Sequence, residues 1–189
     1  MLAEKCKVAV FVSGGGTNLQ AILDSRGEII KNAEVCLVAS SSKDAYALER
    51  AKKHDIETFI IEDEQRLVEK LKSLEIDFIV LAGYLRILSE EFCKRYSNRI
   101  INVHPSLIPS FCGKGFYGLK VHEKALEYGV KVSGATVHFV NEIPDGGKII
   151  DQKAVRVHEG DTAEDLQKRV MAEAEHIILP QAVENVALM

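Results

Sequence analysis

The chain of 189 residues is 47% apolar and 28% charged, a balance typical of a soluble globular protein that forms one domain, residues 1–189, around a sizeable core. Its net charge of −4 and the absence of a basic block argue against a nucleic-acid partner. No apolar stretch approaches the roughly 20 residues of a membrane span, and the amino end does not resemble a signal peptide. We therefore expect a cytoplasmic protein.

The first part of the chain alternates between short apolar runs and helical patterns. Strands are predicted at residues 7–13, 34–39, 57–61, 77–82 and 100–104, and helices follow the first strand and occupy residues 45–54 and 64–74. Strands that alternate with helices indicate βαβ units. The prediction is an α/β fold with a mostly parallel, Rossmann-like sheet and helices on both faces.

The pattern changes after Pro105. The next segments are a glycine-rich loop at 106–118, a helix at 121–128, and strands at 130–140 and 148–157 joined by a turn. These two strands are predicted to form an antiparallel pair near the C-terminus. Thr162 is expected to cap a last helix, which Pro180 should kink.

Three consecutive glycines follow the first predicted strand. Gly14, Gly15 and Gly16 precede Thr17 and Asn18, and a helix begins there. A strand, a glycine loop and a helix form the layout of an anion site, because the helix start directs N–H groups at the anion. The loop lacks a Walker A ending and dinucleotide spacing. A tight turn is the alternative, but three glycines exceed what a turn needs, which favours a single phosphate.

Asn102 and His104 lie at the carboxyl end of the strand predicted at 100–104. They share one face, because side chains alternate along a strand. Open α/β sheets bind ligands at that end. An amide can donate to a developing oxyanion, and an imidazole can transfer a proton near neutral pH. The alternative is a capped strand end, in which both side chains serve only the turn.

Asp145 lies in a glycine-flanked turn, after a strand on which Thr136 and His138 share a face. A carboxylate beside an imidazole raises the imidazole pKa and can hold a water for proton transfer. The alternatives are an ordinary Asp-Gly turn and a satisfied strand histidine.

The remaining histidines are interpreted as structural or solvated; these are His54, His122, His158 and His176. The four cysteines lack the spacing of metal ligands, so no metal is expected.

Four segments carry a family resemblance. They are Ser-Gly-Gly-Gly-Thr-Asn-Leu-Gln (13–20), Leu-Ala-Gly-Tyr-Leu-Arg-Ile-Leu (81–88), Asn-Val-His-Pro-Ser-Leu-Ile-Pro (102–109), and Gly-Ala-Thr-Val-His-Phe-Val (134–140) followed by Asp-Gly-Gly. Together they resemble the folate-dependent phosphoribosylglycinamide formyltransferases of purine synthesis, over residues 8–183. The resemblance implies a formyltransferase fold and two small-molecule partners, 10-formyltetrahydrofolate as co-substrate and glycinamide ribonucleotide. It also implies a monomer or homodimer that needs no metal, nucleic acid or membrane.

The resemblance also implies roles for individual residues. Asn102 would steady the formyl oxygen, His104 would transfer the proton, and Asp145 would raise the pKa of that histidine and hold a bridging water. Thr136 and His138 would support them. Substrate binding would fall to Gly14, Gly15, Gly16, Thr17, Asn18 and Glu175, and folate binding to Leu85, Arg86, Ile87, Leu88 and Asn102.

Two segments depart from the family pattern. The loop at 110–120 looks longer than the common form and carries Cys112, Phe116 and Tyr117, whereas the segment between the third and fourth strands looks shorter. Arg66 is the candidate in that segment for a folate-contacting arginine.

Two other functions compete with formyl transfer to an amine. A formyltetrahydrofolate hydrolase uses similar Asn, His and Asp groups, but such enzymes usually carry an additional amino-terminal domain, whereas this chain starts at its first strand. A phosphate-binding module without catalysis would explain the glycine loop alone.

Overall fold

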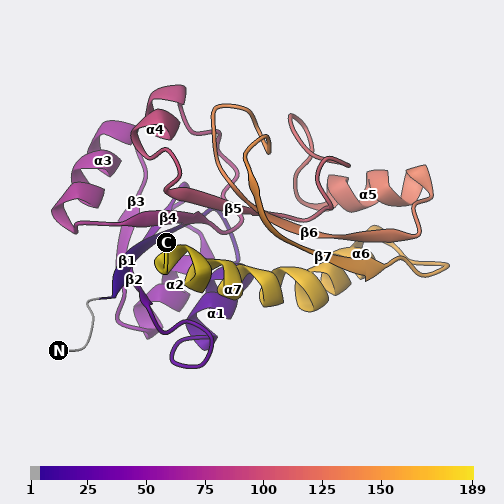
Figure 1. The fold of residues 1–189 in the computed structure, drawn as a ribbon, viewed down its shortest axis with the longest axis horizontal. Coiled ribbons are helices and arrows are strands. Elements are labelled where there is room, and N and C mark those ends of the chain that lie inside the picture. Colours follow the sequence, from indigo (N-terminus) through magenta and orange to yellow (C-terminus); the bar gives the residue numbers. More distant parts are fainter. Residues whose placement is uncertain (1–4) are drawn as a thin grey trace.

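The computed structural model describes residues 5–189, in which seven strands form one sheet of order β3-β2-β1-β4-β5-β6-β7 (Figure 1). The strands are β1 (Cys6–Val12), β2 (Ala33–Ser40), β3 (Glu57–Ile60), β4 (Phe78–Leu81), β5 (Ile100–His104), β6 (Val132–Phe139) and β7 (Ile149–Arg156). The first five pair in parallel, and β6 pairs antiparallel with both β5 and β7. The predicted α/β class, its parallel sheet and its antiparallel pair are confirmed.

Helices cover both faces of the sheet, as Figure 1 shows. One side holds α1 (Thr17–Asp24), α2 (Tyr46–Lys53), α6 (Ala163–Val170) and α7 (His176–Ala187), and the other holds α3 (Glu64–Ser73) and α4 (Glu90–Arg95). Successive side chains of β1 point to opposite faces of the sheet. Val8, Val10 and Val12 pack into one apolar cluster, and Ala9 and Phe11 pack into the other. A strand buried on both faces is continuously apolar, which is why β1 is easily recognised in the sequence.

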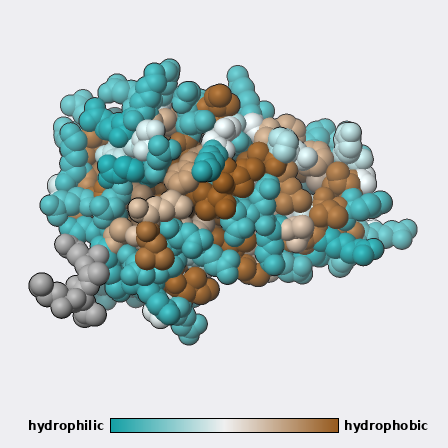
Figure 2. All heavy atoms as spheres, in the orientation of Figure 1, coloured by the Kyte–Doolittle hydropathy of each residue, from teal (hydrophilic) through white to brown (hydrophobic). Residues whose placement is uncertain are grey.

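The surface helices α3 and α4 turn charged residues outward. Figure 2 shows largely hydrophilic residues over this part of the molecule. Their buried residues are Leu67 and Leu71 in α3 and Phe92 and Cys93 in α4. Within the described residues, every helix is too short or too polar to cross a membrane.

The last helical segment contains an irregular turn. Thr162 and Asp165 form a capping box at the start of α6, as the sequence indicated. Residues Met171–Glu175 then form a π-helical turn before α7, which contains Pro180. This π-helical turn precedes the proline, and the kink expected at Pro180 stays a prediction. Wide turns of this kind frequently occur at functional sites, and this one carries Glu175.

The order of the strands determines where ligands can bind. β1 pairs with β2 on one side and with β4 on the other, so successive crossovers leave β1 in opposite directions. Helices on opposite faces leave a crevice at the carboxyl ends of these strands, which is the usual ligand site of open α/β sheets. The loops after β1, β4 and β5 all open there.

Leu166 provides a test of the layer formed by α6. Its side chain is fully buried in the cluster that joins α6 to the sheet. Leu166→Ala is expected to lower the free energy of unfolding by about 2–5 kcal/mol, because it leaves a cavity. Urea denaturation measures this loss. Lys168→Ala, at an exposed position of the same helix, should change stability by less than about 0.5 kcal/mol; equal losses would contradict the assignment of Leu166 to the core.

Candidate active site

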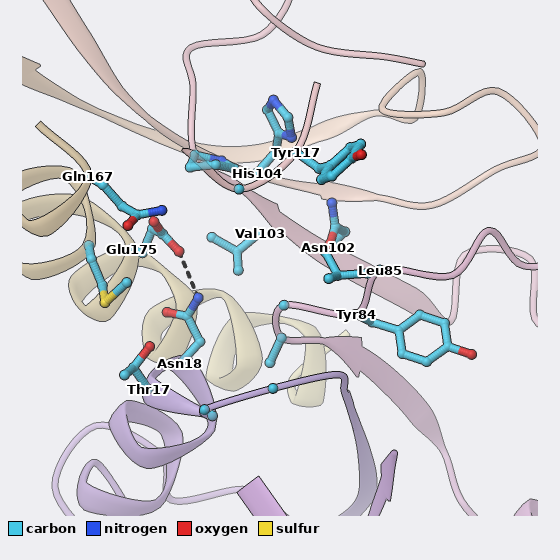
Figure 3. A pocket seen from close by; sticks show the side chains of 18 of the residues that line it. Thr17, Asn18, Tyr84, Leu85, Asn102, Val103, His104, Tyr117, Gln167 and Glu175 are labelled. Atoms are coloured by element: carbon cyan, nitrogen blue, oxygen red, sulfur yellow. Dashed lines mark hydrogen bonds between the residues drawn. The ribbon is translucent and has the colours of Figure 1, made fainter. Parts of the chain in front are cut away.

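A cavity of about 470 Å³ opens at the crevice (Figure 3). It brings together the loops after β1, β4 and β5, the end of the glycine-rich loop, and the segment from α6 to α7. The predicted site residues that line it are Gly14, Gly15, Gly16, Thr17, Asn18, Leu85, Asn102, His104, Asp145 and Glu175. Side chains separated by more than 150 positions in the chain thus share one cavity.

A second cavity, of about 140 Å³, adjoins the first. It contains the other predicted folate residues, Arg86, Ile87 and Leu88, together with the end of β6 and the loop before Asp145. Asn102 and Asp145 line both cavities. Two ligands in the two cavities would therefore meet at these two side chains.

The three glycines of the first loop differ in their surroundings. Gly16 has φ +72° and a Cβ built on it would lie 2.6 Å from the Cβ of Ala47, so this position requires glycine. A Cβ on Gly14 or Gly15 would meet nothing within 4 Å. Gly16 also begins α1 without any side-chain cap, which leaves the first N–H groups of the helix available to a ligand.

Asn18 and Glu175 form a buried polar pair at the same end of the cavity. Asn18 Nδ2 donates to Glu175 Oε2 at 2.7 Å, the dashed line in Figure 3. Burial raises the pKa of the Glu175 carboxyl, and the bond from Asn18 opposes that shift. Asn18 Oδ1 is buried and has no hydrogen-bond partner among the described residues. It remains an acceptor for a ligand hydroxyl or amine.

His104 lies between a carbonyl and a carboxylate. Its Nε2 is 2.9 Å from the carbonyl oxygen of Phe111, and its Nδ1 is 3.5 Å from Asp145 Oδ2. A carbonyl can only accept, so Nε2 carries a proton and the neutral ring has its lone pair on Nδ1.

The net pKa shift of His104 is opposite to the one expected from the sequence. Burial lowers the pKa of the imidazole and outweighs the upward effects of Asp145 and of the Phe111 carbonyl. Burial raises the pKa of Asp145 in turn, but the adjacent His138 and His104 and the bond from the Gly113 N–H together hold it below its ordinary value. Burial therefore favours a neutral His104 imidazole, and the neighbouring groups favour an ionised Asp145 carboxylate.

Asn102 is oriented by His138 on the adjacent strand. The Nδ1 of His138 is 2.8 Å from the Phe139 carbonyl, so that nitrogen donates and Nε2 is left as the acceptor. Asn102 Nδ2 lies 3.2 Å from this Nε2. The antiparallel register pairs Asn102 directly with His138, which explains the contact. One amide hydrogen of Asn102 is thereby occupied, and the other is available to a ligand.

Thr136 supports the loop after β5 without reaching a ligand cavity. Its fully buried hydroxyl donates to the Ser106 carbonyl at 2.7 Å, and the Ile108 N–H donates back to it at 3.1 Å. Gln152 also donates to it, from β7. These bonds hold the backbone immediately after His104.

In the predicted folate segment, the Arg86 side chain forms hydrogen bonds with backbone from two other loops. The Arg86 guanidinium donates to the carbonyls of Ile61 and Ser41, at 3.0 and 2.8 Å, and so links three strand ends. Leu85 and Ile87 are 63% and 79% exposed, which leaves apolar surface beside the cavities.

Arg66, the sequence candidate for a folate contact, is engaged at its own helix. Its guanidinium pairs with Glu62 at 2.9 Å and with Asp63 at 3.6 Å. It lines neither the larger nor the smaller cavity.

Residues that the sequence interpretation missed also line the larger cavity. Gln167 and Tyr117 extend toward it in Figure 3, from α6 and from the glycine-rich loop. His122, which we expected to be structural or solvated, is fully buried in its wall, and neither ring nitrogen has a partner among the described residues. A signal was available: His122 interrupts a buried helical stripe that contains Val121 and Ala125.

Within residues 5–189, no group of three or more His, Cys, Asp or Glu side chains is arranged to hold a metal ion.

Comparison with known proteins identifies the family. The formyl transferase family model matches residues 6–183. Phosphoribosylglycinamide formyltransferase of Haemophilus influenzae is 39% identical, with 94% of this chain and 85% of the relative covered. The crystal structure of phosphoribosylglycinamide formyltransferase from Anaplasma phagocytophilum superposes with a TM-score of 0.90 at 36% identity, covering 98% of this chain and 88% of that one. The chain therefore belongs to the formyl transferase family and, within it, to the phosphoribosylglycinamide formyltransferases.

Other relatives are longer than this chain. It matches the chloroplastic phosphoribosylglycinamide formyltransferases of Arabidopsis thaliana and Vigna unguiculata at 41% and 37% identity, over 94% of its own length in both cases. It spans only 64% and 60% of the length of those two relatives.

His122 makes stability depend on pH. Burial, followed by the charge of His104, lowers the pKa of His122 to about 4 from an ordinary value of 6.5. Between these values the unfolded chain binds a proton that the folded chain does not, so stability falls as the pH drops. The contribution of His122 between pH 7 and pH 5 should be about 1–2 kcal/mol.

Urea denaturation at both pH values measures the effect. His122→Gln should lose less stability between pH 7 and pH 5 than the unchanged chain. An unchanged pH dependence in His122→Gln would show that the imidazole is not buried in its neutral form.

Proposed function

We propose that this chain transfers the formyl group of 10-formyltetrahydrofolate to the amine of 5′-phosphoribosylglycinamide, a step of de novo purine biosynthesis. The observation that carries the proposal is the meeting of two cavities at Asn102 and Asp145, with His104 beside them. A transfer between two small molecules requires this arrangement, because donor and acceptor must approach within about 3.5 Å at the catalytic groups. The relatives named phosphoribosylglycinamide formyltransferase support the choice of substrates.

The ribonucleotide fits the larger cavity. The uncapped start of α1 and the open backbone of Gly14 and Gly15 suit its phosphate. Glu175 and the unpartnered Oδ1 of Asn18 are acceptors for the donor groups of a polar ligand, such as ribose hydroxyls. The amine would then extend along the cavity toward His104.

The formyl donor fits the smaller cavity. Its walls combine the apolar residues Leu81, Leu88 and Val140 with Tyr84, Arg86 and Ile87. An aromatic bicyclic head group needs an apolar slot with a few polar groups at its edge. Asn102 and Asp145 line both cavities, so the one-carbon unit would reach the amine beside them.

His104 is the group that moves the proton. When the amine attacks the formyl carbon, a C–N bond forms, the carbonyl oxygen becomes an oxyanion, and the amine nitrogen carries an extra proton. His104 is kept neutral by burial and can accept that proton at Nδ1, where Asp145 at 3.5 Å stabilises the imidazolium. The proton then passes to N10 of the folate as the old C–N bond breaks, which balances the reaction.

Asn102 stabilises the oxyanion in this scheme. His138 accepts a hydrogen bond from the amide nitrogen of Asn102. This bond fixes the orientation of the Asn102 amide. The second hydrogen can be donated to the oxygen of the formyl carbon. A preoriented donor contributes most when it need not reorganise as charge develops.

The experiment that tests the function supplies 10-formyltetrahydrofolate with and without the ribonucleotide. Deformylation that requires the amine and yields formylated ribonucleotide is the expected result. Deformylation without the amine would identify a hydrolase, and no deformylation in either case would leave only a binding module. Each of these last two results would overturn the proposal.

The proton-transfer pair can be tested by substitution. Asp145→Asn and His104→Gln are each expected to lower kcat by at least about a hundredfold, the usual contribution of general acid–base groups. Asn tolerates the positive φ of +55° at position 145, so that variant should fold normally. Steady-state kinetics measures kcat, and thermal denaturation shows whether each variant is folded. Near-normal turnover in a folded variant would remove that residue from the mechanism.

The glycine loop is expected to bind the ribonucleotide and not the folate. Gly15→Val adds a side chain where no protein atom lies within 4 Å, so it should obstruct a ligand without straining the fold. The KM for the ribonucleotide should rise at least about tenfold, while the KM for the folate stays nearly constant. The converse pattern would assign the loop to the wrong substrate. Gly16→Val is unsuitable, because Ala47 and the positive φ of Gly16 would destabilise the loop itself.

A further inference from the structure

The larger cavity presents an electrostatic problem for an anionic substrate. Two carboxylates, Asp145 and Glu175, line it, and among the described residues no lysine or arginine does. A phosphate dianion at the glycine loop would meet partial charges, such as those of backbone N–H groups and of the α1 dipole, but no full positive charge from the cavity wall. Since binding of the ribonucleotide belongs to the proposed function, the inference that follows rests on that function.

Arg50 is the cation bonded directly to this loop. It lies on α2, and its Nε donates to the Gly15 carbonyl at 2.8 Å. Its Nη1 donates to Gln20 Oε1 in α1, at 3.0 Å. The guanidinium lies 5.1 Å from the ring centroid of Tyr46, which favours one orientation for it. Arg50 therefore joins α2, the loop and α1 from behind the cavity.

The bonds to α2 also determine which way the loop peptides face. The Gly14 carbonyl accepts from the Ala47 N–H at 3.0 Å, and the Gly15 carbonyl accepts from Arg50. In a planar trans peptide the N–H points opposite to the carbonyl. The N–H groups of Gly15 and Gly16 are consequently directed away from α2, and neither carbonyl is free to turn toward an anion.

We propose that Arg50 is a positioning residue for the substrate phosphate: it holds the Gly15 carbonyl away from the cavity and supplies the positive charge that the cavity walls lack. Gly15 separates it from the ligand, so Arg50 acts through the loop. Its contribution is specific to the phosphate, because the rest of the ribonucleotide extends toward His104 and the folate occupies the other cavity.

The test compares the ribonucleotide with the same compound lacking its phosphate. In Arg50→Gln, kcat/KM for the ribonucleotide should fall about tenfold, the loss expected when one partly screened charge near a dianion is removed. The value for the dephosphorylated nucleoside should change less than about twofold, and the KM for the folate should be unchanged. Arg50→Lys keeps the charge but loses the paired donors, so its loss should be smaller.

Lys53 provides the matched control. It is another cation of α2, with its amine 5.9 Å from the same Tyr46 ring, and it lies outside the cavity wall. Lys53→Gln should leave the kinetics of both compounds unchanged, and thermal denaturation should show that all the variants are folded. A tenfold effect in Lys53→Gln as well would indicate a general field effect of α2 and would overturn the proposal.

Failure of this inference can be distinguished from failure of the proposed function. If the unchanged chain transfers formyl groups but Arg50→Gln binds the ribonucleotide normally, the inference is wrong and the function stands. Equal losses for the nucleotide and the nucleoside would also overturn the inference, since they indicate a purely structural role. If the unchanged chain is inactive, calorimetric titration with inorganic phosphate decides the matter: binding that weakens in Arg50→Gln supports the role of Arg50, and equal affinities or no binding to the unchanged chain contradict it.

Discussion

The position of β1 between β2 and β4 is the constraint on which the rest of the structure depends. Because successive crossovers leave β1 toward opposite edges of the sheet, the loops after β1, β4 and β5 open into one crevice. Continuously apolar strands keep this order by burying both faces of the sheet. The glycine loop and the Asn102–His104 pair are separated by some 85 positions in the chain, yet they line a single cavity as a consequence of that order.

Burial and orientation set the chemistry of the crevice. His104 and His138 each have one ring nitrogen bonded to a backbone carbonyl, which determines where the second nitrogen keeps its lone pair. Asp145 approaches both rings, at 3.5 and 3.6 Å, from a turn between β6 and β7. The antiparallel addition of β6 to the parallel sheet is what brings His138 beside Asn102. The arrangement of Asn102, His104, His138 and Asp145 is therefore a property of two strand pairings and one turn.

Much of the fold could be predicted because its signals are local. Apolar runs between glycines marked the strands, helical spacing marked α2 and α3, and every predicted strand lies within two residues of its place in the structure. The features that the sequence did not indicate depend on distant contacts. A π-helical turn forms at Met171–Glu175, before Pro180. His122 is buried in the wall of the cavity, on the helix α5 (Leu119–Tyr128), which packs against α6.

The sequence by itself determined the α/β class, the family, and the residue types that line the site, since strand alternation and short motifs depend only on neighbouring positions. The tertiary structure alone decided the net direction of the His104 pKa shift, because burial of the imidazole outweighs the effect of the Asp145 carboxylate. It also decided that Gly16 requires glycine whereas Gly14 and Gly15 are open. The role of Arg50 depends on α2 lying against the loop, a contact between segments 35 positions apart. Electrostatics and packing are sums over spatial neighbours, and the chain order does not specify those neighbours until the sheet has formed.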